Sequence, residues 1–321
     1  MNPATQLRPA DPPAIEAAAD VLRAGGLVAF PTETVYGLGA DATSGTAVAK
    51  IYEAKGRPHF NPLIAHVPDL AAAEREGIFN AEARKLAQAF WPGPLTLVVP
   101  VAPGCSVSDL ARAGLPSLAL RVPDHPVALA LLRASGRPIA APSANRSGRV
   151  SPTLALHVIG DLEGRIDMVL DGGATSVGVE STIIACLPDG LALLRPGGIA
   201  REDIERVLGH EISQAKDGGA VTAPGMLASH YAPNARLRLD ATSIEKDEAI
   251  LDFGGRFADV QQASFDLSPA GDLAEAASNL FAFLRALDAT GADVIAVAPI
   301  PQEGLGEAIR DRLARAAAPR S

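Results

Sequence analysis

The sequence predicts an α/β protein with a twisted mixed sheet and flanking helices, followed by a small Rossmann-like α/β C-terminal domain. Short apolar runs that are typical of buried strands alternate with stretches of helical period. The later strands of the first part follow one another closely, which favours a mixed sheet over a purely parallel one. A strand–helix–strand pattern recurs near the C-terminal end, where 291–293 (GAD) precede a strand without a GxGxxG motif.

The elements of the first part are indicated by period and composition. Ala-rich stretches are interpreted as helices, because alanine is the best helix former, and apolar runs between turn residues as strands. A helix at 201–208 follows the stop Pro-Gly-Gly. The order is a helix at 14–24, strand 27–30, helix 46–55, strand 63–67, helix 81–90, strands 95–99 and 118–122, helix 127–134, and strands 138–141, 168–170, 182–186 and 191–194.

The chain changes texture near residue 214. QAKDGGAVTAPGMLASHYAP, residues 214–233, is rich in Gly, Pro and small residues without a clear period, and we interpret it as a linker. The predicted division is a main domain at 1–213, a linker at 214–235 and a small α/β domain at 236–321. In the last part we predict strands at 236–239, 249–253 and 294–297, and helices at 273–290 and 306–316.

Composition excludes several classes of protein. Apolar residues make up 48% and charged residues 20% of the chain, so it can form a full core. The net charge of −9 disfavours a stable nucleic acid complex, but leaves room for a small anion held by a few local cations.

Cysteine, histidine and hydropathy patterns narrow the class further. The two cysteines and six histidines show no metal-ligand spacing, so no metal site built from protein alone is expected. No signal peptide is predicted, and no apolar run approaches the roughly 18 residues of a membrane span. We therefore expect a cytoplasmic enzyme with no membrane contact.

Lys55 and Arg57 lie in KGRPHFNPLIAHV, residues 55–67, just before a buried strand. Lysine is a compact charge and arginine a planar fork, and both suit phosphate. The alternative is a helix C-terminus capped by Lys55 and Gly56 with both charges in water. From three residues alone, this alternative is favoured.

Two further segments could hold an anion or another polar ligand. In FPTETVYGLGADA, residues 30–42, a strand ends at Pro31 and a loop follows, in which Thr32, Thr34 and Tyr36 could donate hydrogen bonds; an ordinary turn with Glu33 in water is equally favoured. RPIAAPSANRSGRVSPT, residues 137–153, is dense in donors that suit oxyanions, although a Ser-rich helix cap is the alternative. Because no GxSxG motif surrounds the serine of SAN, a serine hydrolase is not expected.

Three further groups of residues could either bind a ligand or have a purely structural role. Arg121 lies within an apolar strand, where it requires either a ligand carboxylate or an ordinary salt-bridge partner. Ser181 and Arg195 lie beside strands, with the same alternative. His230 and Tyr231 either pack on a domain surface or close over a site.

Taken together and in this order, these segments resemble the YrdC-type domain of threonylcarbamoyl-AMP synthases. The resemblance covers about residues 10–210, and GMLASHYAP with the C-terminal unit matches the longer, two-domain form. The family signature of K-x-R followed by S-x-N is present as Lys55/Arg57 and Ser143/Asn145. The segments that carry the resemblance are PTETVYGLGADA, KGRPHFNPLIAHV, FWPGPLTLVVP, LALRVPDHP, APSANRSG, STII and LLRPGGI.

The resemblance implies a YrdC-type fold and a nucleotidyltransferase. L-threonine, bicarbonate and ATP, with Mg²⁺ carried by the ATP, would give threonylcarbamoyl-AMP and pyrophosphate. Downstream tRNA-threonylcarbamoyl transferase proteins would use the product to modify the adenosine beside the anticodon.

The resemblance also implies a role for each site residue. The catalytic centre would be Lys55, Arg57, Ser143 and Asn145. ATP would be held by Arg57, Asn61, Ser117, Ser143, Ser151, Arg195 and Tyr231. Threonine would be held by Thr34, His66, Arg121, Ala141 and Ser181, with Arg121 on its carboxylate. His230 and Tyr231 would belong to a lid that excludes water.

Two rival functions stay open. A double-stranded RNA-binding module without catalysis is disfavoured by the acidic charge balance. A carbamoyl-transfer module of the hydrogenase-maturation kind shares the YrdC-type domain. It ranks low, because the zinc-finger cysteines and the acylphosphatase portion expected there are missing.

Overall fold

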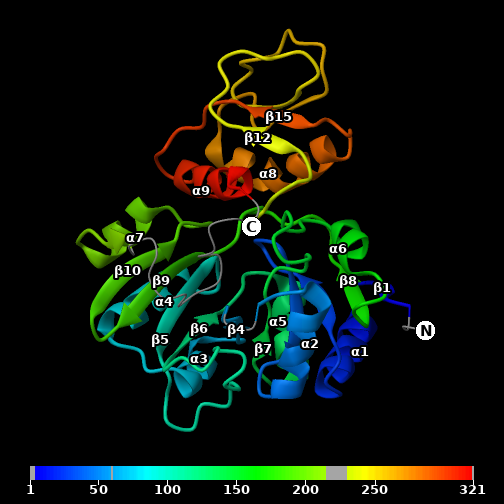
Figure 1. Cartoon of the computed structure of the whole chain (residues 1–321). Coiled ribbons are helices and arrows are strands. Elements are labelled where there is room, and N and C mark those ends of the chain that lie inside the picture. The colour runs from blue at the N-terminus through cyan, green and yellow to red at the C-terminus, as the bar shows by residue number, and fades with distance from the viewer. Residues whose placement is uncertain (1–3, 59–60, 215–229, 320–321) are drawn as a thin grey trace.

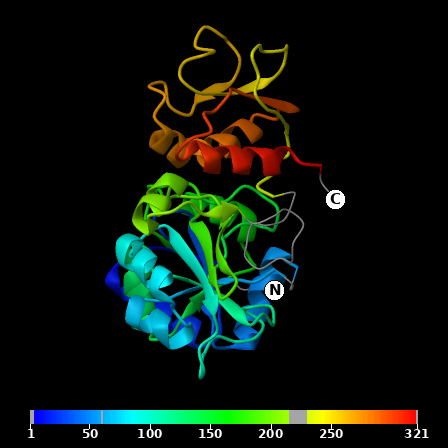
Figure 2. The same cartoon turned by 90° about the vertical axis from the view of Figure 1, so that its left-hand side faces the viewer.

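The computed structural model describes residues 4–58, 61–214 and 230–319. It has a larger unit, built on an 11-stranded sheet, and a smaller unit with a 4-stranded sheet. Figures 1 and 2, at right angles to each other, show the smaller unit stacked on the larger one. No helix in the described ranges is long and apolar enough to cross a membrane.

The larger unit contains most of the elements. Its strands are β1 (Gln6–Pro9), β2 (Val28–Pro31), β3 (Tyr36–Asp41), β4 (Ile64–His66), β5 (Leu95–Pro100), β6 (Ser117–Arg121), β7 (Ile139–Ala140), β8 (Met168–Asp171), β9 (Thr182–Leu187), β10 (Gly190–Arg195) and β11 (Ser213–Gln214). Its helices are α1 (Pro12–Arg23), α2 (Gly45–Lys55), α3 (Leu70–Glu76), α4 (Ala81–Phe90), α5 (Pro126–Ser135), α6 (Ala155–Leu162) and α7 (Arg201–Leu208).

The large sheet is mixed, as the sequence predicts. Its order is β1-β8-β2-β3-β7-β4-β6-β5-β9-β10-β11. β4 runs parallel to β6 but antiparallel to β7, and β5 runs parallel to β9 but antiparallel to β6. Register places His66 beside Arg121 on β4 and β6. Two residues that are 55 positions apart in the sequence thus lie side by side at the carboxyl ends of neighbouring strands.

The interpretation of residues 32–42 as a loop was wrong in its second half. Tyr36–Asp41 is β3, which pairs antiparallel with β2. Its glycines suggested a turn, but Gly39 is required because neighbouring side chains pack against its backbone. A Cβ there would lie 2.8 Å from a ring carbon of Phe30 and 2.9 Å from Ile139, so only glycine fits. The sequence analysis also missed the short elements β1, α3, β11 and β14 (Ser264–Asp266), whereas α6 is the helix that the Ser-rich alternative for 137–153 expected after Pro152.

The smaller unit is a parallel sheet, in keeping with its predicted strand–helix–strand pattern. The strand order is β12-β15-β13-β14, and the three neighbouring pairs are parallel. In Figure 1, α8 and α9 lie between this sheet and the larger unit. The elements are β12 (Arg236–Arg238), β13 (Ala249–Asp252), β14 (Ser264–Asp266), α8 (Leu273–Asp288), β15 (Val294–Val297) and α9 (Gly306–Ala317).

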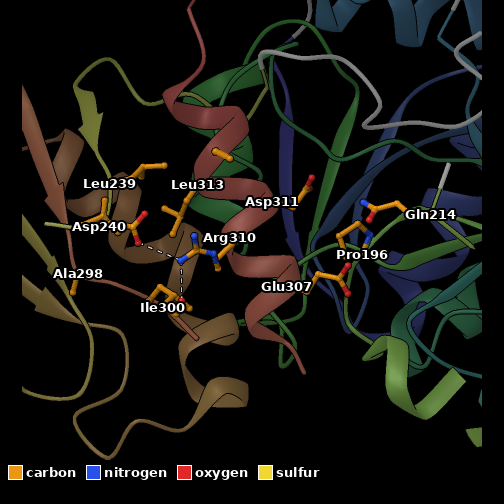
Figure 3. Close-up of a pocket in the computed structure, with 12 residues that line it drawn as sticks. Pro196, Gln214, Leu239, Asp240, Ala298, Ile300, Glu307, Arg310, Asp311 and Leu313 are labelled. Carbon is orange, nitrogen blue, oxygen red and sulfur yellow. Dashed lines mark hydrogen bonds and ion pairs between the residues drawn. The ribbon is translucent and has the colours of Figure 1, made fainter. Parts of the chain in front are cut away.

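Ion pairs link the two units across α8 and α9. Arg285 on α8 lies 2.6 Å from the carboxylate of Asp161 on α6, and Arg201 on α7 pairs with Glu307 on α9. Figure 3 shows Glu307 and Asp311 on the side of α9 that faces Pro196 and Gln214 of the larger unit. Of the predicted linker at 214–235, residues 215–229 lie outside the described residues.

Gly197 should be indispensable for the backbone that carries the site. A Cβ there would lie 2.4 Å from backbone atoms of Glu180, Ser181 and Thr182. We therefore expect Gly197→Ala to lower the free energy of unfolding by about 1–3 kcal/mol, because the strand must shift. Gly45→Ala is the matched control, since no atom lies within 4 Å of its Cβ position. Equal urea midpoints for the two variants would contradict this packing.

Candidate functional site

One cavity of about 50 Å³ collects residues from widely separated segments. Room for only a few water molecules is left in it. The residues named from the sequence that line it are Arg57, His66, Arg121, Ala141, Ser143, Ser181, Arg195, His230 and Tyr231. Those that the sequence reasoning missed are Val35, Ile64, Pro142 and Glu180.

Lys55 joins the two halves of the K-x-R and S-x-N signature. Helix α2 ends at Lys55 because Gly56 adopts the left-handed conformation at φ 61°. The ammonium donates 2.5 Å hydrogen bonds to the backbone carbonyls of Ser143 and Asn145. Burial, and then the charge of Arg57, hold the pKa of Lys55 well below its usual range. Lys55 thus fixes the S-x-N loop from behind the cavity and does not line it.

Arg57 is buried, and its charge faces the cavity. Its guanidinium donates to the carbonyl of Pro62 at 3.1 Å and more weakly to that of Asn61 at 3.4 Å. Burial lowers the pKa of Arg57 to about 10, so the side chain stays charged near neutral pH. The solvated alternative for this motif is wrong for both charges, although Gly56 does cap the helix as that alternative expected.

The S-x-N loop presents a buried hydrogen-bond acceptor, the side-chain oxygen of Asn145, that has no donor among the described residues. Asn145 is fully buried and its amide donates to the carbonyls of Arg146 and Arg149 at 2.8 Å. Its side-chain oxygen has no partner among the described residues, and the same is true of Asn61. Buried polar atoms of this kind are normally satisfied, so a ligand or water is expected there.

Glu180 is the carboxylate that the sequence reasoning missed. It accepts 2.5 Å from the hydroxyl of Ser151 and 2.7 Å from Arg312 on α9. Burial alone would raise the pKa of Glu180, but the charges of Arg312 and Arg195 and the Ser151 hydrogen bond lower it to about 2. The sequence pattern drew attention to the neighbouring Ser181, but nothing local marks Glu180, because its partner on α9 is 132 positions away.

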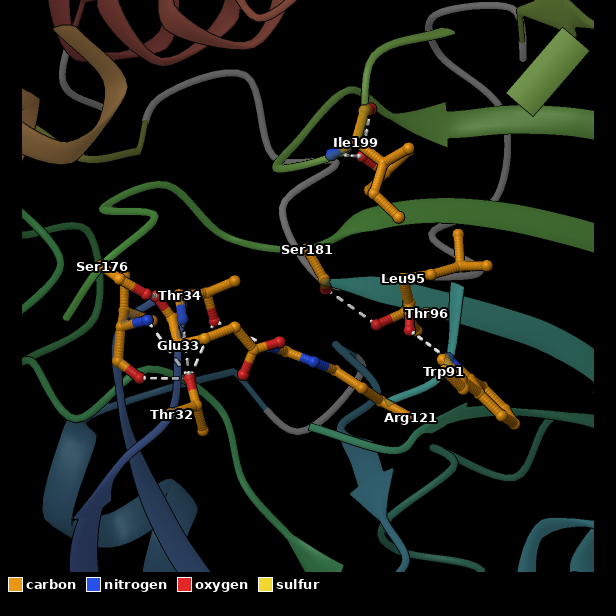
Figure 4. Close-up of polar contacts among 12 residues, drawn as sticks. Thr32, Glu33, Thr34, Trp91, Leu95, Thr96, Arg121, Ser176, Ser181 and Ile199 are labelled. Carbon is orange, nitrogen blue, oxygen red and sulfur yellow. Dashed lines mark hydrogen bonds and ion pairs between the residues drawn. The ribbon is translucent and has the colours of Figure 1, made fainter. Parts of the chain in front are cut away.

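The surroundings of Arg121 fit both of the roles expected for it, an ordinary salt bridge and the binding of a ligand carboxylate. Figure 4 shows it reaching toward Glu33 and Thr34, which lie 2.6 and 2.9 Å from its guanidinium. The ordinary salt bridge that was the alternative is therefore present. One oxygen of Glu33 and the Nε of Arg121 are nevertheless buried without a partner in the described chain. This pair can accommodate a further polar ligand.

The opposite wall is built by Ser181 and Arg195. The Ser181 hydroxyl lies 2.8 Å from that of Thr96 on β5, as Figure 4 shows. Arg195 on β10 donates to the Ser181 carbonyl at 2.8 Å and to its hydroxyl at 3.2 Å. Both residues are buried, so neither is a surface charge or a surface serine.

Two histidines in the cavity wall are neutral. Burial, and then the nearby Arg121, lower the pKa of His66 to about 3. Burial likewise lowers the pKa of His230 to about 3, against the opposing charge of Glu180. Each ring leaves its Nδ1 without a partner among the described residues.

Tyr231 has a strained backbone and a buried ring. Its φ of 63° lies in the left-handed region, which is rare for a bulky residue. The ring stacks on Phe281 of α8 at 5.6 Å and meets the His230 ring edge-on at 4.0 Å. Burial, and then Glu180, raise the pKa of Tyr231.

Some named residues lie beside the cavity and do not line it. Thr34 bonds to Arg121, Ser151 bonds to Glu180, and Asn61 offers its carbonyl to Arg57. Ser117 begins β6, at the opposite end from Arg121. It precedes by two residues Ala119, which pairs with Ile64 on β4.

The mixed sheet, the second α/β unit and the buried cavity lined by three guanidinium groups define a two-domain α/β protein with a candidate ligand site. Residues 20–197 match the family model Sua5_yciO_yrdC, described as Telomere recombination. Residues 199–318 match the model described as Threonylcarbamoyl-AMP synthase, C-terminal domain. The chain belongs to the threonylcarbamoyl-AMP synthase family, in its two-domain form.

Relatives match over nearly the whole length. The threonylcarbamoyl-AMP synthase of Bacillus subtilis is 46% identical over 95% of this chain and 93% of its own. The Pyrococcus abyssi protein of the same name is 44% identical over 94% of this chain and 93% of its own. A crystal structure of P. abyssi Sua5 complexed with L-threonine has a TM-score of 0.89, with 40% identity over 98% of this chain and 96% of that chain.

The histidines of the cavity should stay neutral well below pH 6. With a pKa near 3, the rings of His66 and His230 are expected to show neutral ¹⁵N shifts from about pH 8 down to pH 5. His210 is the internal control, because its hydrogen bonds to Glu211 and Glu82 raise its pKa, so its ring should be protonated at the acid end of this range. A His66 ring that titrates near 6.5 would mean that the cavity is open to water.

Proposed function

We propose that this chain joins L-threonine, bicarbonate and ATP into threonylcarbamoyl-AMP and releases pyrophosphate. The observation that carries the proposal is the meeting of K-x-R and S-x-N, 88 positions apart, through the Lys55 ammonium. Beside that junction the described lining contains three guanidinium groups and one carboxylate. A polyphosphate is the ligand that such a charge surplus suits.

The threonine end of the site lies around Arg121. We infer that its guanidinium binds the threonine carboxylate, since it lines the cavity and one of its N–H groups is unpaired among the described residues. Thr34, His66, Ala141 and Ser181 surround that position. Support comes from the P. abyssi relative, whose structure is of a complex with L-threonine.

The ATP end lies around Arg57 and Arg195. In the proposal the triphosphate contacts these two cations and the S-x-N residues Ser143 and Asn145. Asn61, Ser117, Ser151 and Tyr231 hold the rest of the nucleotide.

The reaction consists of carbamate formation followed by a displacement at phosphorus. The threonine amine bonds to the carbon of bicarbonate, whose hydroxyl leaves with an amine proton as water, or to CO₂, in which case the amine proton is released; both routes give the carbamate. A carbamate oxygen then bonds to the α-phosphorus while the bond to the bridging oxygen of the β-phosphate breaks, and pyrophosphate leaves. Negative charge builds up on the α-phosphate oxygens, so the fixed cation Arg57 and the donors of the S-x-N loop stabilise the transition state.

Mg²⁺ would enter with ATP and remain on its phosphates. The described residues contain no cluster of three metal-ligating side chains. Glu180 is the carboxylate in the described lining, and its two oxygens already accept from Ser151 and Arg312. The protein therefore fits an ion held by phosphate and water oxygens.

The product is proposed to pass to tRNA-threonylcarbamoyl transferase proteins. A cytoplasmic site of action is part of this proposal, because ATP, threonine and tRNA meet there. The net charge of −9 supports a handover to protein over a stable complex with the tRNA itself.

His230 and Tyr231 are proposed to act as a lid. The cavity of about 50 Å³ cannot admit ATP while both rings line it. A closed site protects the carbamate, which loses CO₂ once it is protonated, and the adenylate, which water hydrolyses.

Pyrophosphate release should require both co-substrates, because attack on the α-phosphate needs the carbamate. We expect release from ATP only when threonine and bicarbonate are both present. Arg57→Ala should abolish it, since removing a buried phosphate partner costs on the order of 2–5 kcal/mol. Steep salt-dependent RNA binding without threonine-dependent release would instead favour the RNA-binding alternative.

Removing the His230 ring from the lid should uncouple pyrophosphate release from product formation. In His230→Ala we expect less threonylcarbamoyl-AMP per pyrophosphate released, because water reaches the intermediates. The control is Asn234→Ala, on the same segment but bonded to Arg149 and Asp288 outside the cavity. A product ratio in His230→Ala equal to that of the control would refute the lid.

A further inference from the structure

Arg312 brings a charge from the C-terminal unit into the catalytic one. It lies on α9, has no exposed surface, and donates to Glu180 at 2.7 Å, Asp311 at 2.6 Å and the Pro196 carbonyl at 3.0 Å. Its guanidinium carbon also lies 5.1 Å from the centre of the Tyr231 ring. Glu180 and Tyr231 both line the cavity.

Glu180 poses an electrostatic problem for a triphosphate site. It is an ionised carboxylate in the wall of a buried cavity, where charges interact more strongly than in water. Left to itself, it would repel the incoming phosphates or attract the cations that should bind them. The charged and titratable groups around it are Arg312 on α9, Arg195 on β10, Lys55 at the end of α2, and His230 and Tyr231.

Arg312 solves this problem from outside the cavity wall. It holds one oxygen of Glu180, Ser151 holds the other, and the same guanidinium supports the Tyr231 ring. Because Arg312 does not line the cavity, it neutralises Glu180 without occupying the space of the ligand.

We propose that Arg312 is a positioning residue of the ATP site, which keeps Glu180 and Tyr231 in place and preserves the positive charge that faces the triphosphate. The inference rests on the proposed function and deepens it. It assigns the C-terminal unit an electrostatic part in nucleotide binding, so that residues of both units contribute to the site.

Direct binding of a non-hydrolysable ATP analogue separates this inference from the function. By calorimetry, Arg312→Met should weaken binding about tenfold or more, because it leaves a buried carboxylate unpaired beside the phosphates. Glu180→Gln combined with Arg312→Met removes both charges and should restore most of the affinity. The control is Arg310→Met on the same helix, whose side chain bonds to Asp240 and the Ile300 carbonyl, and it should bind like wild type.

Kinetics provide a readout that a structural defect would not mimic. In Arg312→Met the KM for ATP should rise far more than the KM for threonine. Without its strongest cation, the pKa of Glu180 should rise above its present value of about 2. ATP binding by this variant should therefore improve as the pH falls through the raised pKa, whereas wild type should show no such gain.

Each outcome decides one of the two proposals. If wild type fails to bind the analogue, the proposed function fails. If wild type binds it and Arg312→Met binds equally well, or the double variant is no better than the single one, the role of Arg312 is refuted. If Arg312→Met does not fold, Arg312→Lys takes its place, since it keeps the charge but has fewer donors. Binding by Arg312→Lys should then be several-fold weaker, and wild-type affinity would overturn the inference.

Discussion

Several basic side chains lie buried in or directly behind the wall of one small cavity, and the architecture around it makes that arrangement stable. A charge removed from water is costly unless partners replace its hydration. Lys55 is held by two carbonyls, Arg57 by the Pro62 carbonyl, and Arg121 by Glu33 and Thr34. These partners lie in the loops that follow β2 and β7 and in the segment before β4, and the cations lie at or next to the end of a helix or strand.

The mixed sheet provides these anchors by register. The parallel pairing of β4 with β6 places His66 beside Arg121, and the pairing of β5 with β9 continues the wall toward Ser181. The backbone at Gly197 lies so close to the backbone of Glu180, Ser181 and Thr182 that only glycine fits there. Behind the cavity wall, Arg312 of the second unit bonds to Glu180 and lies against the ring of Tyr231. In the proposed function, substrate binding and the exclusion of water therefore depend on the packing of the two units together.

Local pattern was enough to predict much of this molecule. The helix at 201–208 is found at those bounds, the sheet is mixed, and the signature pairs Lys55/Arg57 and Ser143/Asn145 do converge. What the sequence could not reveal depends on contacts across long separations. Strand β3 was mistaken for a loop, because its glycines are dictated by the neighbouring Phe30 and not by a turn. The Glu180–Arg312 pair spans 132 positions and leaves no periodic or motif signal. The roles assigned by resemblance, such as that of Ser117, stay predictions.

The most direct test is a crystal structure of the full chain with a non-hydrolysable ATP analogue and L-threonine. Our account predicts the α-phosphate within hydrogen-bond reach of Arg57 and the S-x-N loop, with the threonine carboxylate on Arg121. It also predicts that Glu180 remains bonded to Arg312 when the nucleotide is in place. A nucleotide bound elsewhere, with the cavity unchanged and Arg121 still paired only with Glu33 and Thr34, would contradict it.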